Sequence, residues 1–306
     1  MRREEVFVAH RRLQGVLRPT PLVRCDAHDA WLKLENLQVT GAFKVRGALN
    51  ALAIQVERGD RRGVVAASAG NHARGVAWAA RHFGLDAVVV VPVTAPRTKV
   101  DGCRALGARV VAHGETYDDA LGEARRIATS EGRRFVHAFD DPDVIAGQGT
   151  VGVELRPLEP DVVLVPIGGG GLASGIAVAM DCRVVGVQVE GVDAMVRAIK
   201  GEEGPWEPAA TVADGLRVRC AGRLTRRICS RLDRIVTVTE AEVRSAVAEL
   251  ASCDRVVAEG AGAAAVAALA KVSGRRRVAV VSGGNIDGRK LVELCAEQWT
   301  KSGSRE

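Results

Sequence analysis

From about residue 63 onward, short β-branched runs alternate with alanine-rich stretches, and this alternation limits the possible folds more than any other feature. Several runs are apolar on both faces, as is typical of parallel strands buried under helices. The pattern predicts strands at Val64–Ser68, Ala87–Pro92, Arg109–Ala112, Phe135–His137, Val162–Ile167, Arg183–Val189, Arg234–Val238 and Val278–Ser282. It predicts helices between them, including Ala73–Phe83, Tyr117–Ser130, Ala241–Ser252, Gly262–Val272 and Asp287–Gln298. We therefore expect an α/β protein with mostly parallel sheets.

Length and charge narrow the class of protein further. The chain has 306 residues, 47% of them hydrophobic, which is enough for two lobes. Its net charge of +6 comes from scattered basic pairs and triples without interleaved aromatics, so we expect no nucleic-acid binding. The uncharged stretch between Asp161 and Asp181 contains Pro166 and four glycines, which would break a spanning helix, so we expect no membrane span.

Cysteine usage and the N-terminus point to the cytoplasm. The seven cysteines are widely spaced, odd in number and without a CxxC pair, which favours reduced thiols over disulfides or a zinc site. Residues 2–5 are charged and are not followed by the apolar run of a signal peptide. We expect no regulatory domain after Trp299. Residues 201–208 are rich in turn formers and predict an exposed loop, with a lid as the alternative.

Four consecutive glycines, Gly168–Gly171, directly follow the apolar run Val162–Val165. Without Cβ atoms, successive backbone N–H groups can converge on an anion, and a following helix adds the positive end of its dipole. The loop therefore predicts a phosphate cradle. A flexible turn without a ligand is one alternative. A dinucleotide loop is another, because Glu190 lies at about the required distance.

Two further loops follow predicted strands. Ser68 to His72 combines a hydroxyl, a glycine, an amide side chain and exposed N–H groups, which suits a carboxylate. Taken in isolation, Ser68 is better interpreted as a helix N-cap and His72 as a packed helix residue. The loop Ser282–Asn285 contains two glycines and is also compatible with a simple turn.

Lys44 stands beside Phe43 among small apolar residues. An isolated lysine is usually a solvated surface group. Here the apolar surroundings would desolvate the ammonium and lower its pKa towards that of a nucleophilic amine.

Taken together, these motifs resemble the threonine/serine dehydratase branch of the fold-type II pyridoxal-phosphate enzymes, which are related to the tryptophan synthase β chain. The resemblance covers nearly the whole chain, and the order of its motifs makes coincidence implausible. The matching segments are residues 19–22, 33–36, 40–48, 68–73, 140–150, 168–171, 213–215, 259–262 and 282–285.

The resemblance implies two open three-layer αβα domains with the cofactor, pyridoxal 5′-phosphate, in the cleft between them. Residues 1–44 and 141–306 would form the large cofactor-binding domain. Residues 45–140 would form the small substrate-binding domain. Relatives are commonly homodimers or homotetramers, and we expect the same here.

The resemblance also implies roles for individual residues. Lys44 would be the catalytic residue and would carry the cofactor as a Schiff base. The other cofactor-binding residues would be Phe43 beside the ring, Asn71 at the ring hydroxyl, Gly168, Gly169, Gly170 and Gly171 at the phosphate, and Ser282 at the pyridine nitrogen. The substrate carboxylate would be received by Ser68, Ala69, Gly70, Asn71 and His72.

The implied reaction is β-elimination of a hydroxy-amino acid, L-threonine and also L-serine, to a 2-oxo acid and ammonia. A lyase, synthase or racemase acting on another β-substituted amino acid, such as hydroxyaspartate, phenylserine, diaminopropionate or an activated serine, is the alternative. A NAD(P)-dependent dehydrogenase and a non-catalytic binding protein are more distant ones.

Two departures from the family pattern matter. Ala69 stands where serine racemases have a second serine, so we expect weak or absent racemase activity. Val196 stands where metal-activated members have a carboxylate, although Glu190 and Ala194 match, so we expect no metal site.

Overall fold

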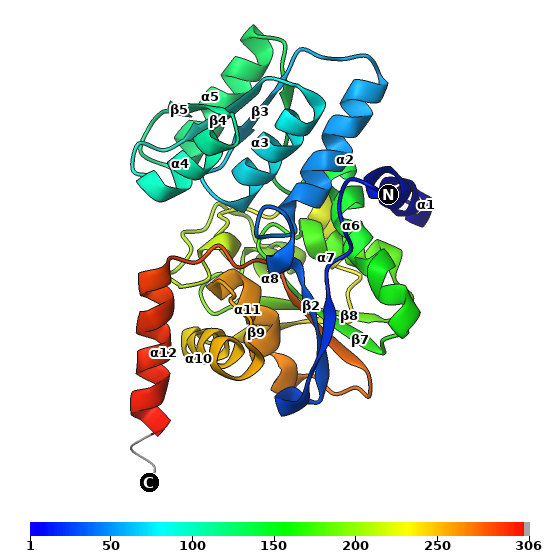
Figure 1. The fold of residues 1–306 in the computed structure, drawn as a ribbon, viewed down its shortest axis with the longest axis vertical. Helices are drawn as coiled ribbons and strands as arrows, with labels where there is room; N and C mark the ends of the chain where they lie inside the picture. The colour runs from blue at the N-terminus through cyan, green and yellow to red at the C-terminus, as the bar shows by residue number, and fades with distance from the viewer. Residues whose placement is uncertain (303–306) are drawn as a thin grey trace.

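The computed structural model describes residues 1–302, and of residues 299–302 only the backbone. Its strands form two sheets, one of four strands and one of six. Figure 1 shows two lobes, with β3, β4 and β5 in the upper lobe and β2, β7, β8 and β9 in the lower one. Helix α2 (Lys44–Glu57) runs from the junction between the lobes up into the smaller lobe.

The smaller sheet is entirely parallel, in the order β5-β4-β3-β6. Its strands are β3 (Val64–Ala67), β4 (Ala87–Val91), β5 (Arg109–Ala112) and β6 (Arg134–Phe135). The helices of this lobe are α2, α3 (Asn71–Phe83), α4 (Arg97–Ala105) and α5 (Tyr117–Ser130). One face of the sheet packs against α2 and α3, and the other against α5, which makes three layers.

The larger sheet has the order β1-β2-β10-β7-β8-β9, with β1 antiparallel to β2 and every other pair parallel. Its strands are β1 (Leu22–Cys25), β2 (Ala30–Leu34), β7 (Val162–Pro166), β8 (Arg183–Val189), β9 (Arg234–Val238) and β10 (Arg277–Val281). Because β2 pairs with β10, the N-terminal segment is part of the larger lobe.

Helices cover both faces of the larger sheet. One face packs against α10 (Glu240–Glu249), α11 (Gly260–Ala267) and α12 (Gly288–Ser302). The other packs against α1 (Arg3–Leu13), α6 (Pro142–Leu155), α7 (Gly171–Ala179), α8 (Ala194–Ile199) and α9 (Arg223–Cys229). Valine, leucine, isoleucine and alanine fill both cores, as the low aromatic content requires.

Most predicted strands are confirmed, and β5, β8 and β9 have the predicted bounds. The strand expected at 135–137 is wrong in extent, because only Arg134–Phe135 pairs with β3. The helix expected at 262–272 begins at Gly260, ends at Ala267 and is followed by a 3₁₀ turn. The helix expected at 241–252 ends at Glu249, where a π-helical turn follows. The proposed domain boundaries at residues 44/45 and 140/141 stay a prediction.

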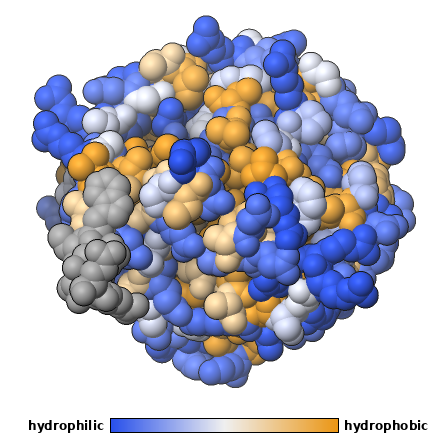
Figure 2. Space-filling view, turned by 60° about the horizontal axis from the view of Figure 1, so that its bottom comes forward, coloured by the Kyte–Doolittle hydropathy of each residue, from blue (hydrophilic) through white to orange (hydrophobic). Residues whose placement is uncertain are grey.

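The molecular surface is mixed in character. The face in Figure 2 carries small apolar patches separated by hydrophilic side chains. Among the helices described, none is both long enough and apolar enough to span a bilayer.

Candidate active site

The predicted loops lie at the carboxyl ends of the parallel strands in both sheets. Residues 68–72 follow β3, residues 167–171 follow β7 and residues 282–285 follow β10, so all three begin where a parallel strand ends. In open α/β sheets ligands bind beyond the carboxyl ends of the strands. Hydrogen bonds between these loops, described below, join the two lobes at this edge.

Lys44 is the first residue of α2, and its amine lies inside this junction. Lys44 Nζ donates a hydrogen bond to the carbonyl oxygen of Ala138 over 2.8 Å and lies 5.2 Å from the centre of the Phe43 ring. Burial lowers the pKa of Lys44 to about 8. About a tenth of the amine is therefore uncharged at pH 7, far more than for an ordinary lysine, and a nucleophile or a general base requires this form.

The backbone of the Lys44 segment is fastened to the loop after β10. The Phe43 N–H donates to the Ser282 carbonyl over 3.1 Å, and Ala42 forms a β-bridge with Gly283. The hydroxyl of Ser282 is buried and donates to the Ala261 carbonyl over 3.2 Å. Lys44 and Ser282, which are predicted to bind the cofactor at its aldehyde and at its ring nitrogen, thus lie in segments that are joined directly by backbone contacts.

The four glycines form a cup of unsatisfied donors. No described residue accepts a hydrogen bond from the N–H groups of Gly168–Gly171, and α7 begins at Gly171. Gly170 has φ of +88°, which favours glycine. A Cβ on Gly169 would lie 2.2 Å from the Phe139 ring. These free amides at a helix N-terminus fit a phosphate group, and so the residues present fit pyridoxal phosphate.

The loop after β3 also presents free amides. The N–H groups of Ala69, Asn71 and His72 have no acceptor among the described residues, while the Gly70 N–H is taken by Ser68 Oγ. Helix α3 is capped by Gly70, so the interpretation of Ser68 as its N-cap is wrong. The free amides at this helix start suit the carboxylate predicted to bind there.

The interpretation of His72 as a packed helix residue is confirmed. Its side chain is 3% exposed, and its Nε2 lies 2.9 Å from the Val136 carbonyl oxygen. Burial, with a smaller contribution from the charge of Lys44, lowers the pKa of His72 to about 3, so the ring is neutral. Contact of this residue with a substrate would therefore be made by its backbone.

The side chain of Asn71 is held between two residues of the larger lobe. Asn71 Nδ2 donates to Glu259 Oε1 over 2.6 Å, and Asn71 Oδ1 accepts from Asn285 Nδ2 over 2.8 Å. Burial, with a smaller contribution from Asp214, raises the pKa of Glu259 to about 7. Sequence reasoning assigned no role to Glu259. Its only signal was the segment 259–262 within the family resemblance.

Three more residue pairs cross between the lobes. Lys99 of α4 pairs with Asp214 over 2.5 Å, and Arg219 pairs with Asp118. Arg74 of α3 donates to Asn285 Oδ1 over 2.9 Å. Sequence reasoning missed all of these contacts, since each joins residues at least a hundred positions apart.

The segment after β6 links the lysine to the glycine cup. Ala138 accepts the bond from Lys44, and Phe139 packs over Gly169 and Gly171. The carboxylate of the next residue, Asp140, accepts three backbone N–H groups at the start of α9. The sequence indicated Asp140 only as the first residue of a family motif.

No metal centre is visible in residues 1–302. No group of three or more His, Cys, Asp or Glu side chains there is placed to bind an ion. The loop 201–208 has no helix or strand and is largely exposed.

The fold and the site define a two-lobed α/β protein with a desolvated lysine and an anion cup at the lobe junction. A family model described as "Pyridoxal-phosphate dependent enzyme" matches residues 13–284. The chain therefore belongs to the family of pyridoxal-phosphate dependent enzymes.

Individual relatives agree with this assignment. The chain is 42% identical to an L-threonine ammonia-lyase of Thermotoga maritima over 99% of its own length and 80% of that protein's. The crystal structure of a threonine deaminase from T.th. superimposes with a TM-score of 0.88 at 37% identity, covering 94% of this chain and 99% of that one. Maize serine racemase superimposes with a TM-score of 0.90 at 29% identity, covering 99% of each chain.

These findings confirm the predicted fold class, the fold-type II arrangement with mostly parallel sheets, and the cofactor. The protein is an enzyme of the ammonia-lyase type within this family. The dinucleotide interpretation of Gly168–Gly171 is set aside, because the family binds pyridoxal phosphate.

Proposed function

We propose that the protein deaminates L-threonine, and also L-serine: water is lost from the substrate, the resulting imine takes up water again on hydrolysis, and the net products are a 2-oxo acid and ammonia. The observation that carries this proposal is the partly buried amine of Lys44, hydrogen-bonded to the Ala138 carbonyl and with its pKa lowered to about 8, in the same junction as the free amides of Gly168–Gly171. The names of the relatives, L-threonine ammonia-lyase and threonine deaminase, support threonine as the substrate.

The residues of the chain divide the work as follows. The amides of residues 168–171 would bind the cofactor phosphate, and Asn71 and Ser282 would hold its ring. Bound pyridoxal phosphate would supply an electron sink for the bonds at the substrate Cα. Lys44 Nζ would carry the cofactor and would serve as the base that takes the proton from Cα. The free amides of residues 69–72 hold the substrate carboxylate.

Ser282 favours elimination over competing reactions. A hydroxyl does not keep the pyridine nitrogen protonated as a carboxylate would, so the ring is a weaker electron sink. Loss of a β-hydroxyl would then be favoured over return of the proton to Cα. Ser282 is 3% exposed, which would keep water away from the ring nitrogen.

A substrate panel tests the proposal. Purified protein supplied with pyridoxal phosphate should release ammonia and a 2-oxo acid from L-threonine and L-serine, and Lys44→Ala should abolish both products. If ammonia were released faster from hydroxyaspartate, phenylserine or diaminopropionate than from threonine, that compound would be the preferred substrate instead. No turnover of any of these compounds would support a binding protein.

Racemisation is the second candidate, because maize serine racemase shares the fold over 99% of both chains. Against it, Ala69 offers no hydroxyl to deliver a proton to the other face of Cα. Chiral chromatography of L-serine incubations should therefore show no D-serine.

We also propose a cytoplasmic homodimer or homotetramer. The seven cysteines are free thiols, as a reducing compartment would keep them. Leu37, Val39 and Val257 are 60%, 54% and 47% exposed and flank the hydrogen bond from Asn36 Nδ2 to the Val257 carbonyl. Such a patch suits a subunit contact. Light scattering should give a multimer that Leu37→Glu weakens, and a monomeric native protein would refute this proposal.

A further inference from the structure

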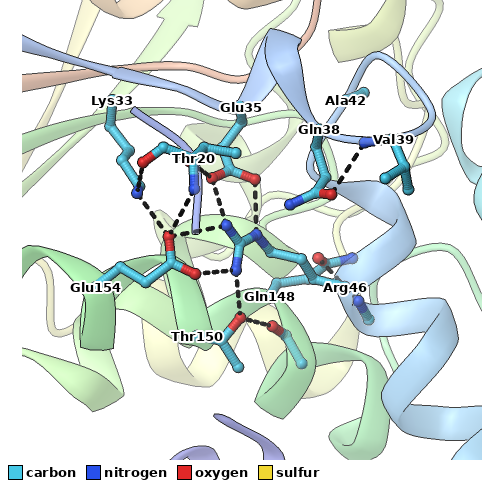
Figure 3. Close-up of polar contacts among 12 residues, drawn as sticks. Thr20, Lys33, Glu35, Gln38, Val39, Ala42, Arg46, Gln148, Thr150 and Glu154 are labelled. Atoms are coloured by element: carbon cyan, nitrogen blue, oxygen red, sulfur yellow. Dashed lines mark hydrogen bonds and ion pairs between the residues drawn. The ribbon is translucent and has the colours of Figure 1, made fainter. Parts of the chain in front are cut away.

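A buried network of four charges lies beside the first turn of α2. It consists of the cations Lys33 and Arg46 and the anions Glu35 and Glu154, whose side chains are 2%, 2%, 0% and 8% exposed. Figure 3 shows the Arg46 guanidinium in the centre, with Glu35 above it and Glu154 to its left. The two cations and two anions balance, so no net charge is buried.

Arg46 uses all its nitrogen atoms in this network. It donates to Glu35 through Nε over 2.7 Å and Nη2 over 2.8 Å, and to Glu154 through Nη1 over 2.6 Å and Nη2 over 3.0 Å. Its Nη1 also donates to Thr150 Oγ1 over 3.1 Å. These contacts tie α2 to the segment after β2 and to α6. Only a guanidinium has this number of donors in a rigid plane.

Lys33 and Thr20 complete the network. Lys33 Nζ donates to Glu154 Oε2 over 2.6 Å and to the Thr20 carbonyl over 2.7 Å. Thr20 Oγ1 donates to Glu35 Oε1 over 2.5 Å. Removing one partner would leave an unpaired charge in the interior, whereas replacing a whole ion pair by neutral side chains of similar size is far less costly.

Beyond Arg46, α2 crosses α6 at close backbone contact. A Cβ on Gly147 would lie 2.6 Å from the Cα of Gly47 and 2.5 Å from the Arg46 carbonyl oxygen. The Arg46 N–H also closes the first turn of α2 by donating to the Phe43 carbonyl over 3.0 Å. The position of Lys44, two residues before Arg46, is thus set by contacts on both sides.

We propose that Arg46 is a positioning residue for Lys44: its five-bond anchor to Glu35, Glu154 and Thr150 holds the first turn of α2 so that the Lys44 amine stays desolvated in the lobe junction. This inference rests on the proposed function, in which that amine is the reactive group. The Arg46 guanidinium is buried and donates to protein groups, so we assign it no contact with substrate or cofactor.

The hydrogen bonds of Arg46 act on Lys44 by keeping water away from its amine. Burial is the cause that lowers the pKa of Lys44, so a loosened first turn that admits water raises that pKa. The titratable groups that face Lys44 from neighbouring segments are His72 and His137, and burial lowers the pKa of both rings. Both are neutral above pH 7 and do not obscure the titration of Lys44.

Arg46→Lys tests the proposal, because it keeps the charge and loses the planar fork. The extent of competitive acetylation of Lys44 in the cofactor-free full chain is followed against pH by peptide mass spectrometry. We expect a midpoint near pH 8 in the native protein and a midpoint about one pH unit higher in Arg46→Lys. This measurement requires no turnover, so it separates failure of the anchor from failure of the proposed function.

Arg12→Lys is the matched control. Arg12 also makes a bidentate pair, with Glu57 over 2.7 and 2.9 Å, but at the far end of α2. It should lower the melting temperature without moving the Lys44 midpoint. An unchanged midpoint in Arg46→Lys, or an equal shift in both variants, would overturn the proposal.

Two further variants apply if Arg46→Lys does not fold. Thr150→Val removes one of the five bonds and should give a smaller shift in the same direction. The double variant Lys33→Met with Glu35→Gln keeps the network neutral and should also raise the midpoint. Absence of a shift in both folded variants would refute the positioning role.

Discussion

Gly169→Ala should weaken cofactor binding by a clash that the structure locates. The added Cβ would lie 2.2, 2.3 and 2.5 Å from three carbon atoms of the Phe139 ring, whereas ordinary contacts begin at 3.4 Å. The loop or the ring must therefore move by about 1 Å. Overpacking of this kind costs about 1–3 kcal/mol, which corresponds to roughly a 5- to 150-fold rise in Kd if the amide cup is displaced.

Absorbance titration of cofactor-free protein with pyridoxal phosphate measures this Kd. Gly122→Ala is the control, since a Cβ there meets nothing within 4 Å, and it should bind like the native protein. Phe139→Ala in the Gly169→Ala background should restore part of the affinity, with Phe139→Ala alone completing the cycle. Native affinity in Gly169→Ala, or no recovery on removal of the ring, would refute the packing argument.

Three further predictions concern single groups of the site. Since the folded-state pKa of Lys44 is about 8 against an ordinary 10.5, the cost of burying its charge is fully present below pH 8 and disappears as pH rises towards 10.5. Cofactor-free Lys44→Met should accordingly resist urea by about 2–3 kcal/mol more than the native protein at pH 7, and equal stability there would contradict the assigned burial. Ser282→Asp should increase transamination and racemisation relative to elimination, measured as product ratios, and an unchanged ratio would count against a role for the hydroxyl. Ala69→Ser should introduce measurable D-serine formation, and its absence in an active variant would mean that this position does not control racemisation.

Local signals in the sequence predicted most of the strands and the loops that follow them, but not the long-range contacts that hold these loops together. Lys44, the glycines and the loops after β3 and β10 were predictable because each carries a local signal, namely a strand that ends in small residues or an amine among apolar neighbours. The structure brings them together at one edge of the sheets. Their assigned roles at the cofactor stay predictions.

Strand β2 was not predictable, and the lysine it contains explains why. Lys33 is the fourth of the five residues of the strand and is 2% exposed, since Glu154, 121 positions away, neutralises it. A charged residue in a buried strand breaks the apolar pattern on which strand prediction depends. The hydrogen bonds of Arg46 were not predictable either. Glu154 and Thr150 are more than a hundred positions away in the sequence and meet Arg46 only after folding.

The bounds of α11 were predicted less well than its existence. The helix was expected to begin at Gly262, but it begins two residues earlier, at Gly260. A Cβ on Gly262 would lie 2.1 Å from the Gly283 carbonyl oxygen, so the glycine reflects close contact with the loop after β10. Glu259, directly before this helix, is placed beside Asn71 by the same close packing.

The central claim is that Lys44 carries the cofactor, and reductive trapping tests it most directly. The full chain, incubated with pyridoxal phosphate and reduced with borohydride, should yield one dominant modified peptide, with the added mass on Lys44 and a visible absorption band that is lost on reduction. An adduct mainly on Lys33, Lys99 or another lysine, or an unmodified Lys44, would contradict the account.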